Sequence, residues 1–106
     1  DHEAIQVKLA NMYINLEAAR QITRNVLNYN LTSMPPRTEL SMASKIYTTN
    51  TCYQVAHEAI QVFGGNGLSK EYLIEKLFRD LRATLIEDGS NDSLTIAVAR
   101  KLIYGE

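Results

Sequence analysis

The chain has little of the chemistry that would mark a metalloprotein, a secreted protein or a nucleic-acid binder. Its 106 residues include one cysteine, Cys52, and two histidines, neither of which has a second ligand at metal spacing. One thiol cannot form an intrachain disulfide or a cysteine-rich metal cluster. Eleven basic residues stand against twelve acidic ones, a net charge of −1, so there is no broad positive field to attract nucleic acid. We expect no resident metal and no nucleic-acid partner.

Long apolar runs are also absent. No stretch reaches the roughly 18 apolar residues of a membrane span, and no basic and apolar leader is present. We therefore expect no membrane span. The lone cysteine, which has no disulfide partner in the chain, favours a reducing compartment, which is the cytoplasm, or the mitochondrial matrix in a eukaryote. Strand periodicity, internal repeats and low-complexity tracts are missing too, which leaves helical periodicity as the main structural signal.

Two long stretches show that periodicity, with inward positions at spacings of four and three. They predict one helix over about residues 2–29 and a second over about residues 38–63. Between them Pro35 and Pro36 break the helix, because proline lacks an amide donor and disfavours helix in its predecessor. The inward positions are Ile5, Leu9, Met12, Leu16, Ala19, Thr23 and Val26, then Met42, Ile46, Thr49, Tyr53, Ala56, Ile60 and Phe63.

Two shorter helices follow. Ile74, Leu77, Leu81 and Leu85 mark a third helix, which we expect Gly89 to end. Ser90 can cap a fourth helix that carries Leu94, Val98 and Leu102 on one side. The prediction is a single all-α domain over residues 1–106, folded as an up-and-down helical bundle.

A glycine cluster, Gly64-Gly65-Asn66-Gly67, follows the second predicted helix directly. Main-chain amides at glycines lack β-carbon shielding, so a flat or anionic ligand can approach them closely. Taken alone, the cluster is more typical of an ordinary helix stop. A dinucleotide-binding fingerprint is excluded, because its glycines follow a strand.

The second cluster is the turn Asp88-Gly89-Ser90, which begins 27 positions after Gln61. A carboxylate at such a turn can face a cleft, where loss of solvation raises its pKa toward a value useful for taking a proton from carbon. The alternative is capping, in which Gly89 ends one helix, Ser90 begins the next and Asp92 complements the helix dipole.

Together with Ala18-Ala19-Arg20, Glu71-Tyr72 and Arg79-Asp80, these clusters resemble the C-terminal helical domain of the acyl-CoA dehydrogenases over most of the chain. The resemblance implies the C-terminal part of a longer FAD-dependent enzyme. Such an enzyme removes the α-proton of an acyl-CoA thioester with a carboxylate and passes the β-hydrogen to FAD as hydride. The resemblance also implies a homo-oligomer, a dimer or tetramer, with an electron-transfer flavoprotein as candidate electron acceptor.

The resemblance assigns roles by position. Asp88 would be the catalytic base, and Gly89 would let the thioester substrate approach. The adenine and pyrophosphate end of FAD from a neighbouring subunit would meet the first cluster, and the flavin would meet the second. The cofactor-binding residues would be Gln61, Val62, Phe63, Gly64 and Gly65, then Ser90, Asn91 and Asp92.

Several positions depart from the family pattern, among them Glu3 in place of a glutamine and Leu73 where proline is common. Asp88 stands where glutamate is usual, Glu87 where tyrosine is common, and Asp92 where the family carries a neutral amide. Two alternatives therefore stay open: a nitroalkane oxidase-like or monooxygenase-like flavoenzyme, and a non-catalytic helical oligomerisation module. Because the family's first helix is not represented, we also expect an uncovered apolar strip. Because the cofactor-facing turn is here without the rest of the enzyme, we expect the Gln61 side chain and the Gly64 and Gly65 amides to be open to solvent.

Overall fold

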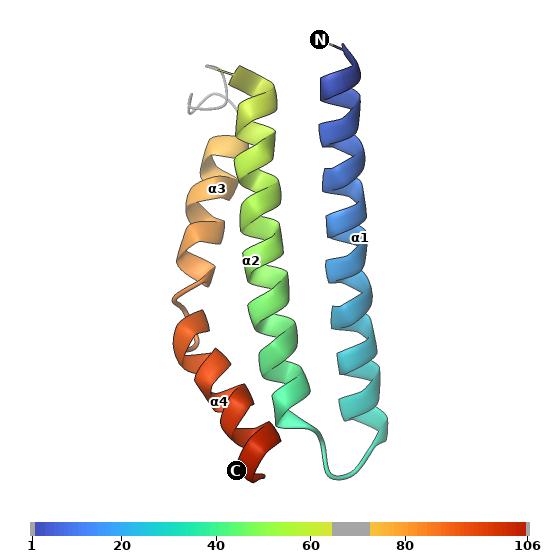
Figure 1. Ribbon diagram of the computed structural model, residues 1–106, viewed down its shortest axis with the longest axis vertical. Coiled ribbons are helices and arrows are strands. Elements are labelled where there is room, and N and C mark those ends of the chain that lie inside the picture. The colour runs from blue at the N-terminus through green and yellow to red at the C-terminus, as the bar shows by residue number, and fades with distance from the viewer. Residues whose placement is uncertain (1, 65–72, 106) are drawn as a thin grey trace.

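The computed structural model describes residues 2–64 and 73–105, which form four α-helices (Figure 1). These are α1 (His2–Thr32), α2 (Thr38–Phe63), α3 (Leu73–Thr84) and α4 (Asn91–Tyr104). No strand occurs within the described residues. The predicted all-α class with up-and-down helices is confirmed.

Helix α2 is the centre of the arrangement. It packs against each of the other three helices, whereas α1 touches only α2 among the helices that the structure describes. Figure 1 shows α1 on one side of α2, and α3 and α4 following one another along the other side. The body is elongated, 49 × 24 × 23 Å. Any group on the joint between α3 and α4 is therefore positioned by α2.

The helix boundaries mostly follow the sequence signals. Helix α2 spans the predicted residues, and Ser90 caps α4 as expected. Helix α1 runs three residues beyond the predicted end at Tyr29, to Thr32. The main-chain amide of Ser33 still donates to the Tyr29 carbonyl at 2.9 Å, because no proline interrupts the ladder before Pro35.

The end of α3 was predicted wrongly. The helix stops at Thr84, well before Gly89. Beyond it, the amides of Ile86 and Glu87 both donate to the Ala83 carbonyl, and the amide of Asn91 reaches the Leu85 carbonyl at 2.9 Å. The residues between the two helices thus form a closed turn of their own.

Burial is uneven along the predicted inward positions. On α2 all of them except Phe63 are buried or half-buried, because this helix has neighbours on two sides. On α1, Ala19 is 3% exposed, but Leu9 and Leu16 remain exposed, since only α2 covers that helix. Leu77 and Leu102 are exposed as well. The predicted uncovered apolar surface is therefore present, and it extends over several helices.

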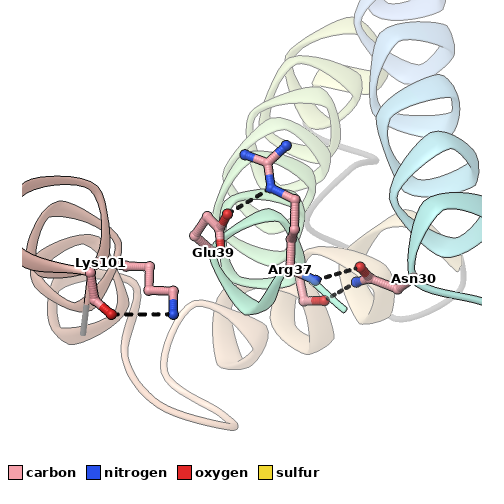
Figure 2. A network of polar contacts seen from close by, with 6 residues as sticks. Asn30, Arg37, Glu39 and Lys101 are labelled. Carbon is pink, nitrogen blue, oxygen red and sulfur yellow. Dashed lines mark hydrogen bonds and ion pairs between the residues drawn. The ribbon is translucent and has the colours of Figure 1, made fainter. Parts of the chain in front are cut away.

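A polar network fixes the connection between α1 and α2 (Figure 2). The Asn30 side-chain amide donates to Ser41 Oγ at 2.8 Å, and its oxygen accepts the Arg37 amide at 2.9 Å. Arg37 Nε pairs with Glu39 Oε1 at 2.7 Å. The hydrogen bond from Arg37 is the largest cause that lowers the pKa of Glu39, and the charge of Lys101 on α4 acts in the same direction.

This lowered pKa predicts a pH dependence of stability. A carboxylate whose pKa is lower in the folded state stabilises the fold above its usual pKa of 4.5 and loses that contribution as the pH falls through the lowered value. We expect Glu39→Gln to remove part of the acid-induced loss of stability, measured by urea unfolding between about pH 7 and about pH 3. Arg37→Met should remove the same part. An unchanged pH profile in both variants would contradict the proposed ion pair.

Candidate functional site

The turn between α3 and α4 has an unusual backbone. Asp88 adopts a φ of 56° and Gly89 a φ of 91°. Asp88 is the only non-glycine residue with positive φ in the described chain, and aspartate is among the few residues that tolerate that region. Such conformations cost about 1–3 kcal/mol and persist where the surroundings fix them. The turn thus needs external support.

That support comes from α2. Lys45 Nζ donates to the Gly89 carbonyl at 3.1 Å and to Asn91 Oδ1 at 2.7 Å. The Asn91 side-chain nitrogen donates in turn to Thr49 Oγ1 at 2.9 Å and to Asn50 Oδ1 at 3.0 Å. Asn91 is only 9% exposed. We call Lys45, Thr49, Asn50 and Asn91 the Lys45–Asn91 cluster; it ties the turn to the central helix.

The start of α4 follows the capping interpretation. Ser90 Oγ accepts the amide of Ser93 at 3.1 Å and lies 2.9 Å from the Ser93 hydroxyl. Asp92 occupies the exposed first turn of α4, where its charge favours the helix dipole. The Ser90 hydroxyl and the Asn91 amide are therefore already engaged within the chain.

A hollow of about 230 Å³ lies beside this turn. Ser90, Asn91 and Asp92 all line it, so the structure brings together the three residues to which the resemblance assigns the flavin. Arg82 of α3 and Asn50 of α2 complete its polar lining. Neither Asp88 nor Gly89 borders the hollow.

Asp88 itself is exposed, as are Glu87 and Gly89. The cleft that the sequence analysis expects around Asp88 is not formed by the described residues. A β-carbon built at Gly89 would meet Leu94 Cδ2 at 3.3 Å. The space that this glycine leaves open therefore faces the first turn of α4, which gives Gly89 a packing role in addition to any contact with substrate.

The end of α2 carries the other predicted surface. Gln61 is exposed in the last turn of the helix, as expected, Val62 is half-buried and Phe63 is exposed. Gly64 ends α2 with φ 65° and ψ −139°, a combination that is essentially restricted to glycine. Its amide donates to the Gln61 carbonyl, so the expectation of an open Gly64 amide was wrong.

Among the described residues, none crowds the side of Gly64 on which a β-carbon would stand. A β-carbon built there would have no heavy atom of residues 2–64 or 73–105 within 4 Å, which leaves that side of the main chain open toward those residues. Gly65 lies outside the described residues. The exposed Gln61 amide can both donate and accept beside this open surface. The geometry fits a flat polar ligand at the end of α2.

The two surfaces are well separated. The turn contacts α2 at Thr49 and Asn50, eleven residues before Gln61. At a rise of 1.5 Å per residue, this places them about 17 Å apart along the helix. One side-chain-sized group cannot touch both, so they form two contact surfaces.

Lys45 is the residue that the sequence analysis missed. It follows Met42 by three positions and precedes Thr49 by four, which places it on the inward side of α2. A lysine there needs a partner for its charge or hydrogen bonds. The need for a partner could have marked Lys45 as a residue of interest. Local spacing could not identify the partners, because they lie 44 and 46 residues away.

The sequence matches the family model described as "Acyl-CoA dehydrogenase, C-terminal domain" over residues 1–103. The chain belongs to the acyl-CoA dehydrogenase family. It is 33% identical over 101 residues to "Isobutyryl-CoA dehydrogenase, mitochondrial" of Dictyostelium discoideum, with 94% of this chain and 24% of that protein covered. It is 33% identical over 104 residues to "Cyclohexane-1-carbonyl-CoA dehydrogenase" of Geobacter metallireducens, with 97% and 27% covered.

A solved structure shares the fold as well. The match is to a chain in "Electron transferring flavoprotein of Acidaminococcus fermentans: Towards a mechanism of flavin-based electron bifurcation", with a TM-score of 0.89 and 27% identity. It covers 96% of the present chain and 27% of that chain. The chain thus spans about a quarter of the length of the acyl-CoA dehydrogenase relatives it matches.

Other reactive groups have ordinary surroundings. Among the described residues, no three histidine, cysteine, aspartate or glutamate side chains group closely enough to hold a metal ion. Burial raises the pKa of the Cys52 thiol, which disfavours the reactive thiolate. Arg79 and Asp80 take part in exposed ion pairs on α3, with Glu75 and Lys76. A membrane-crossing helix of sufficient length and apolar character is not found in the described parts of the chain.

Proposed function

We propose that this chain is the C-terminal helical domain of an FAD-dependent acyl-CoA dehydrogenase in which Asp88 removes the substrate α-proton. The observation that carries the proposal is the exposed carboxylate at φ 56°, on a turn tied to the central helix. Family membership and the names of the two relatives support an acyl-CoA thioester as substrate.

The residues of this chain have separate tasks in that reaction. The Asp88 carboxylate accepts the α-proton of the thioester, with Gly89 beside it on the substrate side. Aspartate reaches about 1.5 Å less far than the usual glutamate, so the turn must bring its main chain closer to the substrate. Bound FAD would supply the hydride acceptor for the β-hydrogen.

The end of α2 would hold part of the cofactor. The open side of Gly64 and the exposed Gln61 fit the adenine and pyrophosphate end, together with Val62, Phe63 and Gly65. At the other surface, the hollow is bordered by charges of both signs, Asp92 and Arg82. Following the resemblance, we assign the phosphates to the end of α2, and the uncharged flavin ring system to the surroundings of Ser90, Asn91 and Asp92.

Further subunits and domains complete the proposed enzyme. Large apolar side chains lie exposed on all four helices, and several gather near the C-terminal end of α4: Leu102, Ile103 and Tyr104. We propose that homo-oligomer contacts and other domains cover such surfaces and also enclose Asp88. An electron-transfer flavoprotein is the proposed electron acceptor, in keeping with the structural match.

Reduction of the bound flavin tests the function. The full-length protein, loaded with FAD and kept anaerobic, would be mixed with straight-chain, branched and cyclic acyl-CoA thioesters. We expect at least one to bleach the flavin absorbance. A nitroalkane in a parallel arm tests the oxidase alternative. Bleaching by the nitroalkane alone would overturn the dehydrogenase proposal, and bleaching by none of the compounds would favour the non-catalytic module.

A further inference from the structure

We propose that Lys45 and Asn91 are positioning residues that hold the Asp88–Gly89 turn in register with α2. Their catalytic consequence rests on the function proposed above. Lys45 Nζ donates to the Gly89 carbonyl at 3.1 Å, which is the main-chain oxygen of the residue directly after Asp88. The tether therefore acts close to the proposed base without touching the substrate.

Asn91 makes the tether specific. Its oxygen accepts from Lys45 at 2.7 Å, and both hydrogens of its amide are used by Thr49 and Asn50. If the side-chain amide of Asn91 were reversed, its NH₂ group would face the Lys45 ammonium, and neither group could accept a hydrogen bond from the other. The side chain thus has one favourable orientation, and it is fixed by partners on a single helix.

The backbone of the turn explains why such a tether is needed. Asp88 and Gly89 both have positive φ, and a non-glycine residue in that region relaxes unless its surroundings prevent it. The main-chain amide of Asn91 donates to the Leu85 carbonyl, which closes the turn on itself but does not fix the turn relative to α2. The two hydrogen bonds from Lys45 connect the turn to α2, although Gly89 and Asn91 lie 44 and 46 residues from Lys45 in the sequence.

Lys45→Met in the full-length protein is the direct test. Methionine keeps an unbranched side chain of similar length and removes the donors. We expect the rate constant of flavin reduction by the acyl-CoA substrate to fall about tenfold, since sub-ångström misplacement of a base costs rate. FAD content and the substrate concentration at half-maximal rate should stay near their wild-type values. Lys45→Arg, which keeps charge and donors, should retain most of the rate.

Lys76→Met is the matched control. It also removes one lysine charge, from an exposed pair with Asp80 on α3, and should leave the rate unchanged. Thr49→Val is a milder second variant that removes one partner of the Asn91 amide. It should lower the rate in the same direction by a smaller factor, and it serves if Lys45→Met does not fold.

Hydrogen exchange gives a readout that does not depend on activity. Amides of residues 85–95 should exchange faster in Lys45→Met, or in Thr49→Val, than in wild type and in Lys76→Met. Unchanged exchange would overturn the tether, and faster exchange with an unchanged reduction rate would overturn its catalytic consequence. If none of the acyl-CoA compounds reduces the flavin of the wild-type protein, the proposed function fails. Hydrogen exchange would still show whether Lys45 holds the turn.

Discussion

Asp88→Asn should lower the rate constant of flavin reduction by about 10²- to 10⁴-fold in the full-length enzyme, the range typical for loss of a general base. At 1.36 kcal/mol per decade this corresponds to about 3–5.5 kcal/mol of barrier. Asparagine keeps the shape of the side chain and, like aspartate, tolerates positive φ. The turn should therefore keep its conformation, and FAD content and thermal stability should stay near wild type.

The Glu87→Gln variant shows whether Asp88 or its neighbour is the base. Glu87→Gln removes the neighbouring exposed carboxylate and should leave the reduction rate within about threefold of wild type, since it takes away no general base. If Glu87→Gln abolishes reduction while Asp88→Asn does not, Glu87 is the base. If neither variant slows reduction, the base lies in a part of the enzyme beyond this turn.

Asp88→Glu tests the length of the carboxylate side chain separately from the backbone strain at this position. The extra methylene restores about 1.5 Å of reach, but glutamate is less suited than aspartate to a φ of 56°. We expect a lower melting temperature together with a retained ability to reduce the flavin. If Asp88→Glu keeps both full stability and full activity, the positive φ of this position places no demand on the length of the side chain.

The sequence was sufficient to predict the helices and their order. The inward spacing on α2 gave its bounds, because a helix covered on two sides must be apolar along most of its inner face. The cap at Ser90 was equally local, since serine accepts the amide three residues on. Membership of the family could also be inferred, from the two clusters and their separation.

The parts that sequence analysis missed depend on distant contacts. Helix α3 ends at Thr84, where a closed turn follows, and Lys45 on another helix donates to the Gly89 carbonyl beside Asp88. No local pattern encodes a bond between residues 44 positions apart. The Gly64 amide was expected to be open because a cofactor-facing turn lacks its partner here, but the amide instead donates to the Gln61 carbonyl of its own helix.

Gly89→Ala should be the most damaging single-methyl change in the turn. Alanine at a φ of 91° costs about 1–2 kcal/mol in the backbone. The added carbon would also meet Leu94 Cδ2 at 3.3 Å, a contact tight enough that the Leu94 side chain must give way by a few tenths of an ångström. Overpacking of this kind adds about 1–3 kcal/mol. We expect the free energy of unfolding to fall by about 2–5 kcal/mol, measured by thermal or urea unfolding.

Gly105→Ala is the matched control, because Gly105 also has positive φ, 76°, but nothing within 4 Å of a β-carbon. It should cost only the backbone part, about 1–2 kcal/mol. In a Leu94→Ala background, Gly89→Ala should cost only the backbone part, because the double-mutant cycle removes the contact between the two residues.

The same variant also reports on catalysis. Because even a small displacement of the proposed base costs rate, the Gly89→Ala variant should show flavin reduction about tenfold slower than wild type, and Leu94→Ala should restore part of that rate. If Gly89→Ala costs no more stability than Gly105→Ala but still slows reduction, the Leu94 contact is unimportant. The missing side chain would then serve the approach of the thioester, as the resemblance alone suggests.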